Sequence, residues 1–222
     1  RFDNQIRALS SNTGFLSRGD GSVRLDCNNS SVIVAINGPA QPTQTKEIVD
    51  RAKIEVSWKS EKGVQMNIDI EREKFIQKSL EEAVIVKSYP RTLISVTIQV
   101  LNEDGSILST AINACTLALI DAGIEMNAML LSSTASLSRK KGSENRIQLD
   151  PCSLEENDSE NLVKVAILSG NEGIVAIKAT GSMSVEELFA CLEAARKACN
   201  SVGVYLRKTI RAKVTEERNN FG

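Results

Sequence analysis

The sequence predicts an α+β fold built from two similar halves, each with a small mixed sheet and packed helices. Three observations predict it. Short β-branched segments fill the first third of the chain, a helical period begins near residue 69, and a second group of strands lies between two later helices. This order lacks the regular βα alternation of a doubly wound sheet. With 222 residues the chain can bury a large core, and we expect a single domain over residues 1–222.

The first third is expected to be a strand meander. Its strands are predicted at residues 6–10, 23–27, 31–37 and 52–58, separated by Gly, Asn, Asp and Pro. Residues 31–36 read SVIVAI, an uninterrupted apolar run that predicts a strand buried on both faces. Gly38-Pro39 ends this strand.

The middle of the chain predicts two helices around one strand. A helical period of apolar residues runs through residues 69–86 and ends at Tyr89-Pro90, and residues 93–101 form a strand. The next helix follows an Asp-Gly-Ser turn at residues 104–106 and ends before Gly123, which suits a left-handed cap. It is apolar on nearly every side, so it must be buried on most of its circumference. Only a narrow stripe is polar: Ser109, Asn113 and Thr116.

The last third predicts four strands and a long helix. Strands are expected at 128–137 and 146–149, separated by a basic turn at 139–142, and an acidic loop is expected at 154–160. The strands at 162–168 and 173–180 should form a hairpin through residues 169–172. Ser184 and Glu187 have the spacing of a capping box at the start of the final helix. Its inner side is predicted to carry Val185, Leu188, Phe189, Leu192, Ala195, Cys199 and Val202, and its end is basic, with Arg207, Lys208, Arg211 and Lys213.

Composition excludes several classes of chemistry. The chain has no histidine, which removes Ser-His-Asp and Cys-His catalysis, histidine acid–base chemistry and the commonest zinc sites. Its five cysteines form no CxxC pair, and three lie in apolar surroundings that suit free thiols, which favours a reducing compartment. The net charge of −1 argues against a wholesale nucleic-acid coat but leaves local basic patches open. No apolar run is long enough for a membrane span, and no signal-like segment opens the sequence.

The turn before the buried helix is one candidate anion site. A strand, a glycine turn and a helix start together present backbone N–H groups at the positive end of a helix, which is a way to hold phosphate. Gly105 and Ser106 are the candidate phosphate-binding residues. The alternative is an ordinary capped core helix.

Asp150 and Glu156 are the candidate catalytic and metal-binding residues. They lie six positions apart across a turn that contains Pro151, a spacing that can bring two carboxylates to one point. Two hard oxygen ligands suit Mg²⁺, with water and substrate phosphate completing the octahedron. The alternative is that the glutamates and aspartates of residues 154–160 form a solvated acidic loop.

Basic side chains that can meet a polyanion are spread along the chain. They are Arg72, Lys74 and Lys78, then Arg91, then Arg139 to Lys141, and finally the basic end of the last helix. Each of them alone can equally be an exposed solubilising residue. Trp58 is the only tryptophan, so a base-stacking platform that reads RNA sequence is not indicated.

An ordered set of motifs resembles the RNase PH family over essentially the whole chain. The motifs are SRGDGS at 17–22, VIVAINGP at 32–39, YPRT at 89–92, DGS at 104–106, ALIDAGI at 118–124 and LDP at 149–151. Each motif is weak alone, whereas their order is specific. Within that family the pattern is most similar to a ring subunit of the eukaryotic RNA exosome.

The resemblance implies an RNase PH fold, with duplicated βαβα halves related to the second domain of ribosomal protein S5. It also implies assembly with related subunits into a hexameric ring capped by S1 and KH proteins, acting in 3′-to-5′ RNA processing and degradation in the nucleus, nucleolus and cytoplasm. Active relatives use inorganic phosphate to cleave RNA and are helped by arginines at two places. This chain has Ile107 where one such arginine is expected and Asn67 and Ile68 where an arginine pair is expected.

The resemblance also assigns roles at the candidate site. It places Asp150 and Glu156 at the two acidic positions, and it leaves Arg72, Lys74 and Gln77 as a partial substitute for the missing arginine pair, in contact with nucleic acid along with Arg91. We therefore expect a non-catalytic or weakly catalytic exosome subunit, and we expect the isolated chain to form a homo-oligomer, a dimer. The alternative is a homo-oligomeric phosphorolytic or Mg²⁺-dependent nuclease that acts on RNA or DNA outside the exosome. Ile107→Arg is expected to raise phosphate-dependent RNA decay if the rest of the site is competent.

Overall fold

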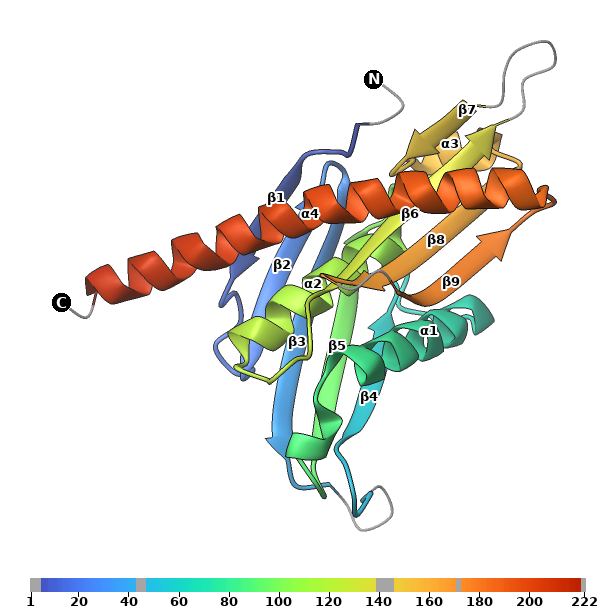
Figure 1. The fold of residues 1–222 in the computed structure, drawn as a ribbon. Coiled ribbons are helices and arrows are strands. Elements are labelled where there is room, and N and C mark those ends of the chain that lie inside the picture. Colours follow the sequence, from blue (N-terminus) through green and yellow to red (C-terminus); the bar gives the residue numbers. More distant parts are fainter. Residues whose placement is uncertain (1–4, 43–46, 139–145, 171–172, 221–222) are drawn as a thin grey trace.

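The computed structural model describes residues 5–42, 47–138, 146–170 and 173–220, and in these residues the chain forms two sheets with helices packed between and beside them (Figure 1). The first sheet has the strand order β1-β2-β3-β5-β4, and only the β4–β5 pair is parallel. Its strands are β1 (Leu9–Thr13), β2 (Gly21–Cys27), β3 (Ser30–Ala40), β4 (Lys53–Lys59) and β5 (Leu93–Asn102). The predicted α+β class and the mixed first sheet are confirmed.

The second sheet has the order β7-β6-β8-β9 and is antiparallel throughout. It consists of β6 (Leu130–Ser138), β7 (Arg146–Leu149), β8 (Asn161–Leu168) and β9 (Ile174–Thr180). The predicted hairpin of β8 and β9 is confirmed, although residues 171 and 172 of its turn lie outside the described residues, as does the predicted basic turn at 139–142. The expectation that this sheet is also mixed was wrong, because each pair of neighbouring strands in it runs antiparallel.

The helices bring the two sheets together. They are α1 (Asn67–Ala83), α2 (Ile107–Asp121), α3 (Ser153–Asp158) and α4 (Val185–Asn220), with a 3₁₀ turn η1 (Val86–Ser88) after α1. Helix α2 contacts β2 and β3 of the first sheet and β6 and β8 of the second, so it lies between the sheets, while α4 lies across β6 and β8 on the opposite face (Figure 1). No helix in the described residues is long and apolar enough to cross a membrane.

The surroundings of helix α2 explain why its surface is apolar apart from one polar stripe. Apart from its last two residues the helix is buried, as its composition predicts. Its polar stripe lies along β6, where β7 pairs only with residues 135–138 and leaves the earlier part of that edge without a strand. Asn113 accepts a hydrogen bond from the Ser132 N–H and donates one to the Ser132 carbonyl, both at 2.9 Å. Thr116 donates to the Leu130 carbonyl at 2.6 Å. The stripe therefore satisfies the backbone groups that a neighbouring strand would otherwise satisfy.

Three sequence expectations need correction in the first half and around α3. The first strand begins three residues later than predicted, because the main chain at Arg7 binds Asp150 instead of a strand. Of the apolar residues in the 31–36 run, Val32, Val34 and Ile36 are fully buried, whereas Ile33 and Ala35 are partly exposed, because helices cover one face of the first sheet. The acidic loop was also a wrong prediction: residues 153–158 form α3, since the Glu155 side chain accepts a hydrogen bond from the Cys152 N–H and closes a capping box.

Helix α4 begins at the predicted capping box, with the Ser184 N–H donating to Glu187 at 2.8 Å and the Glu187 N–H donating to the Ser184 hydroxyl at 3.2 Å. Its buried side carries Cys191, Ala195, Ala198, Cys199, Val202 and Leu206. Val185 and Phe189 were predicted to face inward, and this was wrong: both are largely exposed. They lie on the flank of α4, whereas the sheet contacts of this helix are made mainly with β6 and β8.

Candidate functional site

The turn between β5 and α2 has the geometry of an anion cradle. Gly105 and Ser106 both have positive φ angles, +72° and +50°, and Ser106 is the residue from which α2 starts. Only glycine fits at position 105, because a Cβ atom there would lie 2.4 Å from the Pro151 carbonyl oxygen. Backbone N–H groups at a helix start lie at the positive end of the helix dipole, where an anion is stabilised.

A carboxylate from the same chain already occupies this cradle. Glu156, on α3, accepts a hydrogen bond from the Ser106 N–H at 2.9 Å, and the same oxygen lies 3.9 Å from the Lys164 ammonium. The Ser106 hydroxyl does not point toward an external ligand either, since it donates to the Pro151 carbonyl at 3.0 Å. Glu156 is therefore an internal anion at the positive end of α2.

Asp150 lies in a buried ion pair instead. It is 7% exposed, and its two oxygens accept hydrogen bonds from the Arg7 guanidinium at 2.8 and 3.0 Å, while the Arg7 N–H donates at 3.1 Å and the Cys27 thiol at 3.3 Å. Burial alone would raise the pKa of Asp150, but the hydrogen bonds and positive charge of Arg7 outweigh it and hold the pKa below its ordinary value. Burial also raises the pKa of the Cys27 thiol to about 12, so this sulfur stays protonated.

Arg7 links Asp150 to the cradle. Its guanidinium donates to the carbonyl oxygens of Asp104 at 2.6 Å and Gly105 at 3.0 Å. The cradle is therefore supported from the N-terminal segment as well as from α3. Sequence reasoning missed Arg7 because 97 residues separate it from Asp104, and no local pattern indicates such a contact.

The donor set does not fit a magnesium ion in this conformation. Mg²⁺ needs carboxylate oxygens with free lone pairs and uncompensated charge, whereas Asp150 is neutralised by Arg7 and Glu156 lies on the cradle beside Lys164. No cluster of three or more potential metal ligands occurs among the described residues. Metal binding by Asp150 and Glu156 stays a prediction, and it requires both side chains to leave their present partners.

A group of cations lies near the cradle on three different elements. Arg72 of α1 pairs with Glu103 at 2.6 Å and with Asp69 at 3.4 Å, and it lies over the Trp58 ring with 5.1 Å to the centroid. Lys164 of β8 faces Glu156, and Lys178 of β9 pairs with Glu71 of α1 at 2.9 Å. Burial lowers the pKa of Lys164, and the nearby positive charges of Arg72 and Lys178 lower it further against the opposing effect of Glu156.

Lys164 and Lys178 were missed by the sequence analysis. A lysine inside the otherwise apolar run at 162–168 is the signal that could have pointed to Lys164, since a half-buried charged residue in a strand usually has a partner. Lys178 lies directly opposite Lys164 in the β8–β9 ladder, so its position follows once the hairpin register is known.

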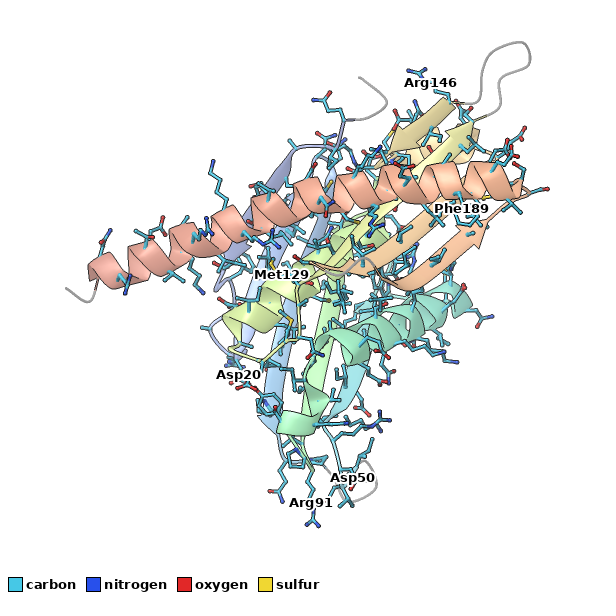
Figure 2. All side chains as sticks on the ribbon, in the orientation of Figure 1. Asp20, Asp50, Arg91, Met129, Arg146 and Phe189 are labelled. Carbon is cyan, nitrogen blue, oxygen red and sulfur yellow. The ribbon has the colours of Figure 1, made fainter. Side chains whose placement is uncertain are left out.

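The other predicted nucleic-acid contacts lie in different places. Lys74 is exposed on α1, and Gln77 on the same helix donates to Glu81 at 3.0 Å. Arg91 pairs with Glu47 at 3.6 Å at the start of β5, whereas the cradle follows the end of β5 (Figure 2). The structure therefore does not bring Arg91 to the cradle, and its predicted nucleic-acid contact would be at a separate surface.

Position 107 has a different environment from the one that the sequence suggested. Ile107 is 2% exposed and belongs to the hydrophobic core. An arginine at this position would have to bury its charge or displace core side chains. The expectation that Ile107→Arg raises phosphate-dependent RNA decay if the rest of the site is competent stays a prediction, and the buried position of this side chain speaks against it.

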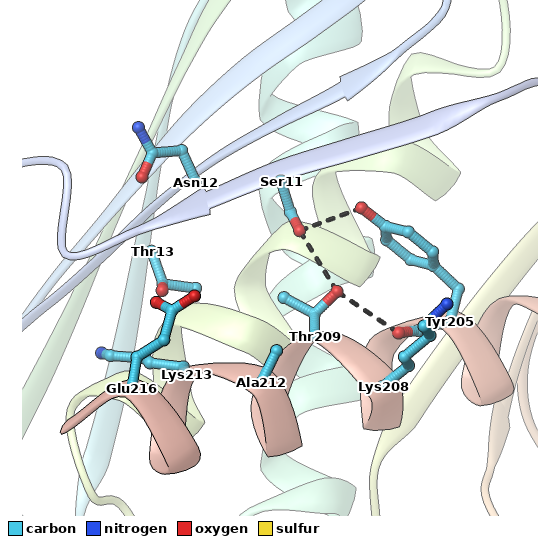
Figure 3. Close-up of a pocket in the computed structure, with 9 residues that line it drawn as sticks. All are labelled: Ser11, Asn12, Thr13, Tyr205, Lys208, Thr209, Ala212, Lys213 and Glu216. Atoms are coloured by element: carbon cyan, nitrogen blue, oxygen red, sulfur yellow. Dashed lines mark hydrogen bonds between the residues drawn. The ribbon is translucent and has the colours of Figure 1, made fainter. Parts of the chain in front are cut away.

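A groove lies elsewhere, between β1 and the second half of α4 (Figure 3). It has a volume of about 560 Å³ and is lined by Ser11, Asn12, Thr13, Tyr205, Lys208, Thr209, Ala212, Lys213 and Glu216. The Ser11 hydroxyl bonds those of Tyr205 at 3.1 Å and Thr209 at 3.4 Å across it. These contacts attach α4 to the first sheet. The groove contains Lys208 and Lys213 from the predicted basic end of the last helix, but none of the predicted catalytic, metal-binding or phosphate-binding residues.

Known proteins resemble this chain in both of its halves. The chain matches the family model described as "3′ exoribonuclease family, domain 1" over residues 5–125 and the model for domain 2 of that family over residues 110–198. The exosome complex exonuclease RRP46 homolog of Arabidopsis thaliana is 30% identical over 225 residues, which cover 94% of this chain and 92% of that protein. The exosome complex component rrp46 of Schizosaccharomyces pombe is also 30% identical, over 82% of this chain and 80% of that protein.

A solved structure agrees with this assignment. The crystal structure of rice (Oryza sativa) Rrp46 superposes with a TM-score of 0.86 at 29% identity, covering 94% of this chain and 97% of that chain. The two family models overlap on α2, the helix between the sheets, so both halves of the chain are accounted for. The chain therefore belongs to the 3′ exoribonuclease, or RNase PH, family and has the fold of its Rrp46 members.

Proposed function

We propose that this protein is a ring subunit of an RNA exosome, where it contributes to 3′-to-5′ RNA processing and degradation with little or no phosphorolytic activity of its own. Two relatives that match most of the chain carry exosome names, which supports the complex. The observation that supports weak catalysis is the Glu156 carboxylate on the Ser106 N–H, because it fills the position where an attacking phosphate would have to bind.

The loss of charge around the cradle supports the same conclusion. Phosphoryl transfer relies on cations and N–H donors that stabilise the charge of the transferring group. Here Ile107 is in the core, and Arg72 and Lys178 are held by Glu103 and Glu71. Removing one such donor from an enzyme typically lowers kcat by about 10²–10³-fold, so a site without several of them should turn over very slowly.

Contact with RNA is the second part of the proposed role. Arg72, Lys164 and Lys178 come from α1, β8 and β9 and lie on the cradle side of the second sheet. Positive groups in such an arrangement attract a phosphate backbone without reading sequence. The proposed partners are RNA, other RNase PH-like exosome subunits and the S1 and KH cap proteins. The proposed locations are the nucleus, nucleolus and cytoplasm.

A nuclease assay tests the catalytic part of the proposal. The purified chain is incubated with end-labelled RNA and with single-stranded DNA, each with and without phosphate and Mg²⁺. We expect no cleavage above background in any condition. Cleavage that requires phosphate or Mg²⁺, is lost in Glu156→Ala and is kept in the control variant Glu160→Ala would contradict the proposal. The protein would then be a nuclease that acts outside the exosome.

Assembly tests the other part. The chain is co-expressed with the remaining RNase PH-like subunits of an exosome ring, and the products are separated by size exclusion and weighed by light scattering. We expect the chain in a complex of ring mass. Recovery of the chain alone, with a complete ring formed without it, would contradict the proposed role.

A further inference from the structure

Strand β1 is an edge of the first sheet. It ends the order β1-β2-β3-β5-β4, and in the described part of the chain no strand pairs with its outer side. Its sequence, LSSNT, contains neither a proline nor a charged residue, and these are the residues that commonly block such an edge. The edge is therefore able to accept a further strand.

Two hydrogen bonds show which main-chain groups of β1 point outward. The Asn28 N–H donates to the Ala8 carbonyl at 3.0 Å, and the Gly14 N–H donates to the Ser22 carbonyl at 2.7 Å. Bonded and non-bonded residues alternate in an antiparallel pair, so the even-numbered residues of β1 bond β2. The odd-numbered residues direct their N–H and carbonyl groups away from the sheet, and they are Leu9, Ser11 and Thr13.

Hydroxyl groups fix the groove beside β1 (Figure 3). The Ser11 hydroxyl bonds those of Tyr205 at 3.1 Å and Thr209 at 3.4 Å, and the Thr209 hydroxyl also reaches the Tyr205 carbonyl at 3.3 Å. These bonds hold α4 against β1 and leave a groove of about 560 Å³ beside them. A strand that enters would meet a preformed surface, which lowers the cost of binding.

Helix α4 presents different groups on the two flanks of this groove. Lys213 marks the flank nearer to β2, because its partner Asp121 also accepts a hydrogen bond from the Ser22 N–H at 2.9 Å. Lys208 lies five residues earlier, about 140° round the helix, and lines the opposite flank. A strand added outside β1 would therefore lie over Lys208 and over Ala212, whose small side chain leaves room for it.

The flank outside β1 is positively charged at one end. Lys208 is exposed, and no carboxylate in the described residues pairs with it. Arg211, about one turn further along α4, is also exposed. Among the described residues that line the groove only Glu216 carries a carboxylate, and it lies at the Thr13 end (Figure 3). A ligand is therefore expected to bring a negative group to the Lys208 end.

The main-chain groups of β1 favour a peptide over a nucleic acid. The outer edge of the strand presents carbonyl oxygens as well as N–H groups. An extended peptide supplies a donor for each carbonyl and an acceptor for each N–H. A phosphodiester supplies only acceptors, so the carbonyl oxygens would repel its phosphates.

We propose that β1 and α4 form a docking site for an extended acidic segment of another protein, which joins the first sheet as a strand outside β1. Residues directly opposite each other in a sheet project to the same face, and Ser11 projects toward α4. The partner residue opposite Ser11 therefore also points toward α4, where an Asp or Glu meets Lys208. Binding here is independent of the proposed role in the ring, because the groove contains none of the cradle residues.

Selection from a peptide library tests the chemistry of the ligand. Random eight-residue peptides displayed on phage are selected on the purified wild-type chain, on Lys208→Glu and on the charge-matched control Lys78→Glu, which alters an exposed lysine of α1. The wild type and Lys78→Glu should enrich the same peptides, with Asp or Glu at one fixed position, and Lys208→Glu should not enrich them. No enrichment, or enriched peptides without a fixed acidic position, would overturn the proposal.

Fluorescence anisotropy with the most enriched peptide tests strand pairing. Thr13→Pro removes an outward N–H but no hydrogen bond to β2, so it should raise the dissociation constant by about tenfold. Thr13→Val keeps that N–H and should leave the constant unchanged, and circular dichroism should show that both variants are folded. Equal affinities of the two Thr13 variants for the peptide would overturn the proposal.

Methylation of the peptide backbone gives the same test without changing the protein. Peptides N-methylated at alternate residues, in the two possible phases, should differ, because only one phase removes the N–H groups that face β1. One phase should therefore lose binding to the wild type by about tenfold or more while the other keeps it. Equal loss in both phases would overturn the proposal. So would Lys208-dependent binding of single-stranded RNA by a groove that binds no peptide, because the occupant would then be a nucleic acid.

Discussion

Asp150 and Glu156 both carry a carboxylate and lie close together in the sequence, but they have different surroundings in the fold. Asp150 has a φ angle of +51°, and its side chain is directed at Arg7. Glu156 is on α3, and its side chain reaches the start of α2. The first carboxylate is held by a buried cation, and the second by an N–H donor at a helix start and a nearby lysine. Each carboxylate therefore has a structural partner that a ligand must displace.

Replacing Glu156 should open the anion cradle. Glu156→Gln removes the negative charge that competes with phosphate at the Ser106 N–H, and Lys164 loses its nearest carboxylate. We expect weak binding of inorganic phosphate that the wild type lacks, measured by calorimetric titration. Glu160 is exposed, so the Glu160→Gln variant should show no phosphate binding in the same titration. Equal binding by wild type and Glu156→Gln would show that the carboxylate is not a competitor.

At the scale of elements, α2 has two roles. Its apolar surface fills the space between the sheets, and its polar stripe completes the hydrogen bonding of β6. The stripe was visible in the sequence as Ser109, Asn113 and Thr116 at helical spacing. Its purpose could not be predicted, because nothing local indicates that β7 is too short to cover the edge of β6.

Asn113→Ala should destabilise the fold strongly. It leaves both the N–H and the carbonyl of Ser132 without their side-chain partner in a buried place, and a buried unsatisfied group costs about 1–3 kcal/mol. We expect the free energy of unfolding in urea to fall by roughly 2–4 kcal/mol on this basis. Ser201→Ala, on the exposed side of α4, should change it by less than about 0.5 kcal/mol. An Asn113→Ala protein as stable as the wild type would mean that β6 finds other partners.

For the molecule as a whole, the buried Arg7–Asp150 pair joins distant parts of the chain. It connects the N-terminal segment, the cradle before α2 and the end of β7. α4 makes a second connection, since Tyr205 bonds Ser11 of the first sheet and Lys213 pairs with Asp121 at the end of α2. The two halves are therefore held together by polar contacts as well as by the shared core.

The ion pair should make stability depend on pH at the acid end. The pKa of Asp150 is lower in the folded protein, so its contribution is fully present above the unfolded value of about 3.9 and is lost as the pH falls through and below that value. The urea midpoint of the wild type should therefore drop as the pH falls below about 4. In Asp150→Asn this part of the drop should be absent, and the protein should be less stable at pH 7 by about 3–5 kcal/mol, because Arg7 stays buried without its partner. Parallel pH profiles for the two proteins would exclude this role.

The sequence by itself determined most of the secondary structure, the family and the chemistry that the chain lacks. Periodicity predicted α1, α2 and α4, turn residues separated the strands, and the absence of histidine and of an arginine at 107 needed no structure. These are local properties, because propensity, capping and composition act over a few residues. Tertiary structure alone decided that Glu156 lies in the cradle, that Asp150 pairs with Arg7, that Ile107 belongs to the core and that β1 is an edge strand. Each of these depends on residues far apart in the chain, whose approach is set by how the sheets and helices pack.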